Sequence, residues 1–342
     1  MPAIFRSRLV NDSFGDPGLY VDFRVRRRAL LFDLGDLAPL TVKQLVRVSD
    51  VFVSHTHMDH FMGFDRLLRA CLGRDARVRL FGPPGFLDQV EHKLGAYTWN
   101  LVENYPADFA LEAWEVDHGW RARGARFRCH RRFGREPLEE HRLPPGVLVD
   151  ENEFRVCAAF LEHRTPCLGF ALEEKTRISV DESGLAELGL PPGPWLKELK
   201  EAVAHGAPDE LPIRVRWRDG ALSLERNLPL EFLRAKLLRF VPGEKICYVT
   251  DVSYQEENAR RIAALAEGAD LLFIECVFLD EDADRAARTC HLTARQAGGL
   301  ARAARARLAV PFHFSPRYTA REQALRDEFE AARCGSTETR DA

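Results

Sequence analysis

The spacing of apolar and polar residues predicts strands and helices that alternate at both ends of the chain. Short apolar runs at 19–25, 29–35, 50–54 and 78–85 predict strands, the last ending in a turn. Helical spacing predicts helices over 41–48, 63–72 and 86–94. After residue 245 the alternation returns, with strands over 245–250, 271–274 and 307–311 and helices over 255–267 and 293–306. This pattern predicts an α/β fold.

Two central segments break the alternation. Residues 109–160 have no strong helical period and predict short strands and loops that begin the second half of the fold. Residues 176–240 have little continuous apolar periodicity and are interrupted at 191–194, 207–210 and 218–221. We interpret 176–240 as an inserted arm or cap within a single domain that spans 1–342. Residues 333–342 predict a disordered tail.

Composition indicates a folded protein of the cell interior. With 342 residues, 46% of them hydrophobic, the chain can bury a large core. No apolar run reaches membrane-spanning length, and the first residues lack the apolar core of a signal peptide. Eight cysteines occur singly, without a C-x-x-C pair, which is typical of reduced thiols. The sequence therefore predicts a soluble, cytoplasmic protein with no membrane partner.

The charge distribution leaves nucleic-acid binding open. A net charge of −3 does not by itself indicate a nucleic-acid partner. Eight arginines nevertheless stand against three glutamates between residues 121 and 142, and Arg24–Arg28 is also basic. These runs are either solvated faces or, if they lie on the side of the catalytic centre, a track for a phosphate backbone.

The strongest chemical signal is Ser-His-Thr-His-Met-Asp-His at residues 54–60. Three imidazoles and one carboxylate fall within six positions, directly after the apolar run Val51–Val53. Imidazole is the commonest metal ligand in proteins. Extended backbone followed by a tight turn would aim His55 and His57 one way and Asp59 and His60 another. One short loop would then serve two metal ions.

This H-x-H-x-D-H motif resembles the metallo-β-lactamase superfamily, and Asp33-x-Gly35 resembles the turn that precedes the motif in that superfamily. The resemblance implies a four-layer αββα sandwich with two metal ions, most simply zinc, with manganese or iron as alternatives. It implies further ligands at His163, Asp251 and His313, each at the end of a strand. One ion would be held by His55, His57 and His163 and the other by Asp59, His60 and His313, with Asp251 bridging the two.

Within that superfamily the chain looks most like the ribonuclease Z branch. The segments that carry this likeness are His163–Phe170, Leu188–Leu196, Glu275–Phe278, His291–Ala294 and His313–Tyr318. The resemblance implies an endonuclease acting on precursor tRNA or a related RNA. It implies that Asp59 is both ligand and general base, that His291 protonates the leaving oxygen and that Glu275 orients His291. Ser315 and Arg317 are candidate contacts for the substrate phosphate.

Other functions stay open at this point. A hydrolase of the same fold, acting on a small phosphodiester, cyclic nucleotide, sulfate ester or lactone, is favoured by the acidic net charge. The altered segment 11–19, which stands where the family has its opening phosphate loop, favours it too. A non-catalytic metal- or RNA-binding module is a third interpretation, and a homodimer is possible. A basic track leading from the metal cleft would favour RNA, whereas a closed pocket would favour a small substrate.

Overall fold

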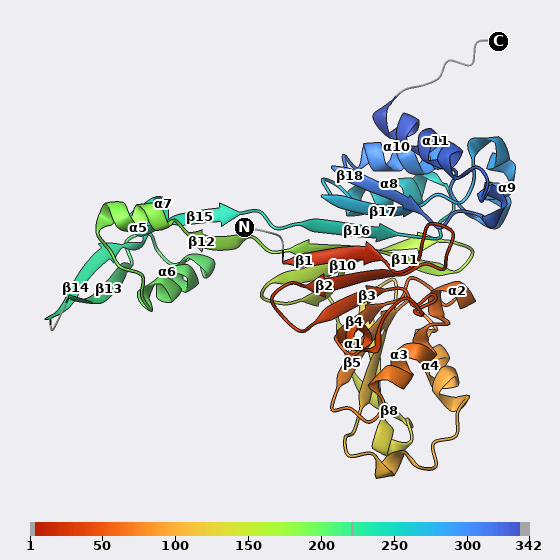
Figure 1. Ribbon diagram of the computed structural model, residues 1–342, viewed down its shortest axis with the longest axis horizontal. Coiled ribbons are helices and arrows are strands. Elements are labelled where there is room, and N and C mark those ends of the chain that lie inside the picture. Colours follow the sequence, from red (N-terminus) through yellow and green to blue (C-terminus); the bar gives the residue numbers. More distant parts are fainter. Residues whose placement is uncertain (1–3, 220–221, 336–342) are drawn as a thin grey trace. The chain divides into compact units, whose positions relative to one another are not determined.

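The computed structural model describes residues 4–219 and 222–335, which form two compact units (Figure 1). The first unit contains the chain up to Glu173 and from Glu244 onward, and the second is Glu174–Gly243. Within the described ranges, no helix combines the length and apolar character that crossing a membrane requires.

The first sheet of the larger unit has eight strands that follow one another in chain order. Strands β3 to β6 are parallel, and the strands on either side of them are antiparallel. The strands are β1 Phe5–Leu9, β2 Leu19–Phe23, β3 Ala29–Phe32, β4 Val48–Phe52, β5 Arg77–Gly82, β6 Ala110–Val116, β7 Arg121–Arg128 and β8 Arg135–Arg142. β3 is buried along its whole length, which is why its sequence is continuously apolar.

The second sheet has the order β18-β17-β16-β11-β10-β9. Its strands are β9 Val147–Asp150, β10 Phe154–Glu162, β11 Pro166–Glu174, β16 Lys245–Val249, β17 Leu271–Glu275 and β18 Leu308–Phe312. β16, β17 and β18 are parallel, so their carboxyl ends lie at one edge of the sheet.

Two expectations about these strands were wrong. The helix expected over 41–48 is a single turn, α1 Val42–Leu45, because β4 begins at Val48 and pairs with Ala29 of β3. Residues 109–160 do not simply begin the second sheet, since β6, β7 and β8 complete the first one. In β7 the buried positions Ala122 and Ala125 are small and alternate with arginines, so their apolar period was weak in the sequence.

Helices cover the outer face of each sheet, which gives the four-layer αββα sandwich that the resemblance implied (Figure 1). Helices α3 Phe64–Cys71 and α4 Phe86–Gly95 pack with α1 against the first sheet. Helices α8 Glu256–Leu265, α9 Ala283–Thr289, α10 Ala294–Ala303 and α11 Glu322–Cys334 pack against the second. Between the sheets lies an aromatic core that includes Phe32, Phe52, Phe170 and Tyr248.

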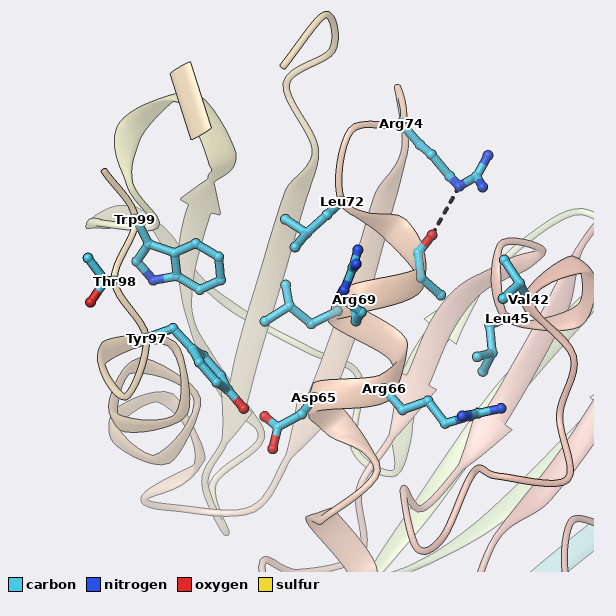
Figure 2. Close-up of a pocket in the computed structure, with 12 residues that line it drawn as sticks. Val42, Leu45, Asp65, Arg66, Arg69, Leu72, Arg74, Tyr97, Thr98 and Trp99 are labelled. Carbon is cyan, nitrogen blue, oxygen red and sulfur yellow. Dashed lines mark hydrogen bonds between the residues drawn. The ribbon is translucent and has the colours of Figure 1, made fainter. Parts of the chain in front are cut away.

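The surface beside α3 is hollowed, although not near the predicted metal ligands (Figure 2). This hollow of about 930 Å³ lies between α1, α3 and residues 97–99. Its lining includes Arg66, Arg69 and Trp99 but none of the predicted site residues. It is therefore separate from the chemistry that the sequence predicts.

The second unit, Glu174–Gly243, has its own core. It contains α5 Glu182–Leu188, α6 Trp195–Ala204, α7 Leu230–Leu237, the hairpin β13 Pro212–Asp219 with β14 Leu222–Pro229, and the pair β12 Arg177–Val180 with β15 Leu238–Val241. Buried Trp195, Leu199 and Leu233 belong to this core. The helices are short and separated by prolines, which hid their periodicity in the sequence. The insertion expected at 176–240 falls inside this unit, and its role as an arm or cap stays a prediction.

Most arginines of the 121–142 cluster have acidic partners. The ion pairs are Arg121–Asp117, Arg123–Glu115, Arg126–Glu112, Arg128–Glu136, Arg132–Glu103 and Arg135–Asp88. β8 is an edge strand with largely exposed charged side chains, a composition that discourages pairing with another chain. These ion pairs favour a solvated face over a phosphate track.

The tail expected at 333–342 begins inside helix α11, which ends at Cys334. That part of the prediction was wrong, since Gly335 adopts the left-handed conformation that commonly ends a helix. Residues 336–342 lie outside the described part of the chain.

Candidate metal centre

The H-x-H-x-D-H segment begins in extended backbone after a strand and ends in a single helical turn. His55 follows β4 and is buried, whereas His57 is the N-cap of the short helix α2 Met58–Phe61. Asp59 and His60 lie in the first turn of that helix. The ring centroids of His55 and His57 are 4.4 Å apart, and those of His55 and His60 are 4.2 Å apart. One loop thus gathers four potential ligands.

The three distant ligands reach the same place from strand ends. His163 directly follows β10, Asp251 follows β16 and His313 directly follows β18. His313 has a positive φ of 59°, which is uncommon for a residue other than glycine. Parallel strands bring their carboxyl ends together, and ligand sites of α/β proteins commonly form there.

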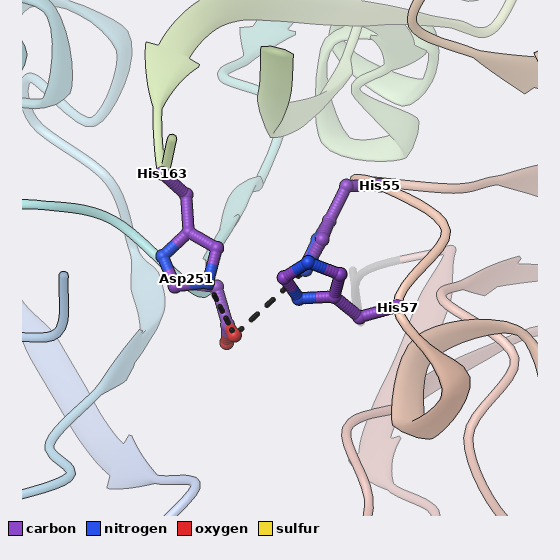
Figure 3. Close-up of side chains that lie close together, drawn as sticks. All are labelled: His55, His57, His163 and Asp251. Atoms are coloured by element: carbon purple, nitrogen blue, oxygen red, sulfur yellow. Dashed lines mark ion pairs between the residues drawn. The ribbon is translucent and has the colours of Figure 1, made fainter. Parts of the chain in front are cut away.

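Distances place the seven side chains in two groups around Asp251. Ligand atoms of His55, His57, His163 and Asp251 all lie within 4.8 Å of one another (Figure 3). Asp251 Oδ2 is 3.4 Å from His163 Nε2 and 3.8 Å from His55 Nε2. Asp59, His60 and His313 form the second group. Asp251 Oδ1 faces this group, at 3.3 Å from His60 Nε2 and 3.0 Å from His313 Nδ1.

Unpartnered nitrogens in both groups fit a metal. His55 Nε2, His60 Nε2 and His313 Nδ1 are buried and face oxygens of Asp251 at 3.8, 3.3 and 3.0 Å, but among the described residues none of them has a hydrogen-bond partner of good geometry. A buried polar atom without a partner is costly. One cation in each group, between converging imidazoles and carboxylates, would satisfy these nitrogens.

Electrostatic coupling in the centre is strong. Burial and the neighbouring His60 lower the pKa of His55 to about 2, so its nitrogen is free to ligate. Burial opposes ionisation of Asp251, but His313 and His60 hold the pKa of Asp251 well below its ordinary value. Burial also lowers the pKa of His313, yet Asp251 more than offsets this and raises that pKa to about 10. Positive charge is therefore favoured at the position that a cation would take.

A buried carboxylate, Asp33, fixes the orientation of His60. His60 Nδ1 lies 2.9 Å from Asp33 Oδ2, which also accepts hydrogen bonds from Ser54 Oγ at 2.8 Å and Tyr248 Oη at 3.1 Å. Such outer contacts set the tautomer and the direction of a ligating imidazole. From the sequence Asp33 was noted only as part of a turn, and Tyr248 was missed because it lies in an apolar strand.

Beside the two groups lies a His–Glu pair. His291 Nδ1 is 2.8 Å from Glu275 Oε2. The other oxygen of Glu275, Oε1, accepts the backbone N–H groups of Val252 at 2.7 Å and Leu292 at 3.3 Å. Burial lowers the pKa of His291, but Glu275 outweighs that effect and raises it. The N-cap of α10 is Thr293, so His291 has no capping role.

A cavity of about 530 Å³ opens over these residues. Its lining is His57, Asp59, His163, Asp251, His291 and His313, with Phe14, Gly15, Asp16, Val277, Phe278, Thr289, Phe314, Ser315 and Pro316. Ser315 therefore lies where the sequence analysis expected a phosphate contact. Arg317 does not line the cavity, because its guanidinium pairs with Asp282 at 3.1 Å.

Known proteins share this fold and much of this sequence. Residues 237–314 match the model of the beta-lactamase superfamily domain. The ribonuclease Z of Deinococcus radiodurans is 36% identical over 311 residues, which cover 89% of this chain and 86% of that protein.

Two solved structures show the same fold. The metallo-beta-lactamase fold protein YhfI from Bacillus subtilis aligns over 96% of this chain and 92% of its own, with a TM-score of 0.53 and 15% identity. The short form of human tRNase Z aligns over 91% and 90%, with a TM-score of 0.51 and 18% identity. The likeness to the Deinococcus protein along most of both chains shows that this chain belongs to the ribonuclease Z family, the metal-dependent endoribonucleases of the metallo-β-lactamase fold.

Proposed function

We propose that this protein cleaves precursor tRNA, using two divalent ions that are zinc. The observation that carries the proposal is the convergence of seven ligand-type side chains and a His–Glu pair around one cavity. The choice of tRNA as substrate is supported by the likeness to the Deinococcus ribonuclease Z and to the human tRNase Z. Nitrogen and carboxylate ligands favour zinc.

The residues divide between the two ions. His55, His57 and His163 would hold one ion, and Asp59, His60 and His313 would hold the other. Asp251 would bridge the two, because each of its oxygens faces one group. When bound, two such cations lower the pKa of water and stabilise negative charge on a phosphoryl oxygen.

Two side chains would move the protons of the reaction. Asp59 is partly exposed to the cavity and would accept the proton of the attacking water. His291 lines the same cavity and would donate a proton to the leaving ribose oxygen. Glu275 would hold His291 in place through Nδ1, which leaves Nε2 for the substrate.

A paired assay tests this assignment. His291→Ala is expected to lower kcat on precursor tRNA by about 10²-fold or more, because an RNA ribose oxygen needs a proton to leave. Hydrolysis of bis-p-nitrophenyl phosphate should fall far less, since p-nitrophenolate leaves without a proton. Glu275→Gln should show the same asymmetry more weakly.

Equal losses on both substrates would assign His291 a structural or metal-linked role. If the metal-replete wild type cleaves no RNA but hydrolyses the chromogenic diester, the substrate is a small phosphodiester instead.

A further inference from the structure

The segment between β1 and β2, residues 11–18, carries three residues of the cavity lining and is fixed by both halves of the sandwich. Asn11 Nδ2 donates to the carbonyl oxygens of Asp16 at 2.8 Å and Asp36 at 3.0 Å. On the other side, the N–H of Phe314 donates to the carbonyl oxygen of Ser13 at 2.7 Å. The backbone of this segment is thus held in place on two sides.

Asp16 is closely packed against Gly35, and its carboxylate has no side-chain partner among the described residues. A Cβ atom at Gly35 would lie 2.7 Å from Asp16 Cβ and 2.5 Å from the carbonyl oxygen of Pro17, so only glycine fits there. Among the described residues, no side-chain donor pairs with the Asp16 carboxylate, which the backbone N–H of Asp36 contacts. Burial and the nearby Asp59 raise the pKa of Asp16. The carboxylate lines the cavity and can accept further hydrogen bonds besides that of the Asp36 N–H.

The lining also contains three phenylalanines, and it contains no lysine or arginine. The rings of Phe14 and Phe314 are 5.5 Å apart at an interplanar angle of 80°, and Phe278 also lines the cavity. A second phosphate bound beside Phe14 would face Asp16, and apart from the histidines of the metal centre the lining has no basic side chain to neutralise it. A planar, uncharged group that carries a hydrogen-bond donor fits this lining better.

We propose that Phe14 and Asp16 bind the nucleoside adjoining the scissile phosphate, with the base against Phe14 and a donor of that nucleoside hydrogen-bonded to Asp16. The donor is either a base amino group or a ribose hydroxyl. This inference rests on the proposed function, because it assigns the cavity to an RNA. It makes Asp16 a specificity residue and adds no metal ligand.

Single-atom changes in the RNA test this contact. Precursor tRNAs are prepared that lack the 2′-hydroxyl, or a base amino group, at one nucleotide on either side of the cleavage site. Wild-type kcat/KM should fall on the order of 10- to 100-fold for the one RNA that lacks the donor, since a hydrogen bond to a charged group is lost. In Asp16→Ala the same RNA should lose nothing further. If the RNA without the 2′-hydroxyl responds, the donor is the ribose hydroxyl. If the RNA without the base amino group responds, the donor is the base.

Controls keep the result specific. Asp75→Ala removes the same charge at an exposed position outside the cavity, and it should keep the wild-type ranking of the RNAs. Metal content of Asp16→Ala should equal that of the wild type. Loss of an ion would make Asp16 a ligand and overturn the proposal, as would equal responses of wild type and Asp16→Ala to every RNA. If the wild type cleaves no RNA, the proposed function fails and this inference falls with it.

Discussion

Asp33 lies outside the two groups of candidate metal ligands and contacts one member of them, His60. Its carboxylate accepts hydrogen bonds from Ser54, next to the histidine loop, and from Tyr248 in the opposite sheet, and it contacts His60. The two halves of the sandwich therefore meet at one carboxylate that orients a ligand.

Tyr248→Phe is expected to weaken metal binding by about 10- to 100-fold, because outer contacts of this kind set ligand direction. Titration against a chromophoric chelator measures the affinity. Tyr20→Phe is the matched control, since buried Tyr20 donates to the carbonyl oxygen of Gln44 outside the centre. Equal affinities in wild type and Tyr248→Phe would show that Asp33 needs no support from the second sheet.

Asp59→Ala is expected to lower kcat on bis-p-nitrophenyl phosphate by at least about 10²-fold, because it removes a proposed base and a proposed ligand together. Metal analysis of the variant separates the two roles. Wild-type turnover with full metal content would mean that Asp59 is neither base nor essential ligand.

At the scale of elements, the packing of α10 on α11 depends on one glycine. A Cβ atom at Gly298 would lie 2.2 Å from the carbonyl oxygen of Phe329, whereas one at Gly299 would meet nothing within 4 Å. Both glycines lie in the same helix.

Gly298→Ala is therefore expected to destabilise the protein by about 1–3 kcal/mol through overpacking. Gly299→Ala should stabilise it by about 0.5–1 kcal/mol, because alanine favours a helix interior. Urea unfolding of both variants measures the free energies. A destabilised Gly299→Ala beside a neutral Gly298→Ala would contradict this packing of α10 on α11.

Elements differed in how well the sequence predicted them. The strands within 29–35 and 271–274 were predictable because β3, Ala29–Phe32, and the residues 271–274 of β17 are continuously apolar and largely buried. β7 was not, since alanine and glycine occupy several of its buried positions.

The site was predictable only in part. Motifs and strand ends identified His55, His60, Asp251 and His313. They did not identify Tyr248 or the carbonyl oxygen of Cys290, which lies 2.8 Å from His163 Nδ1. Contacts between segments distant in the chain leave no local pattern.

At the scale of the whole molecule, the second unit is inserted between two paired strand residues. Glu173 of β11 and Lys245 of β16 are register partners, and their side chains pair at 3.3 Å. A two-residue turn such as Asn-Gly could therefore join them directly in place of residues 174–244, which are the second unit and Glu244.

That deletion is expected to leave hydrolysis of the chromogenic diester within about threefold of the wild type, because the metal-binding groups lie wholly in the larger unit. Cleavage of precursor tRNA should fall by about tenfold or more if the unit acts as an arm for the RNA. Unchanged tRNA cleavage would remove that role, and loss of both activities would show that the larger unit needs the insertion to fold.

The proposed function requires a two-metal centre that cleaves RNA. Its most direct test is single-turnover cleavage of precursor tRNA by metal-stripped protein titrated with zinc. Cleavage should appear only as the second equivalent binds, because the seven side chains form two groups that share Asp251. Full activity at one equivalent, or none at two, would contradict the account.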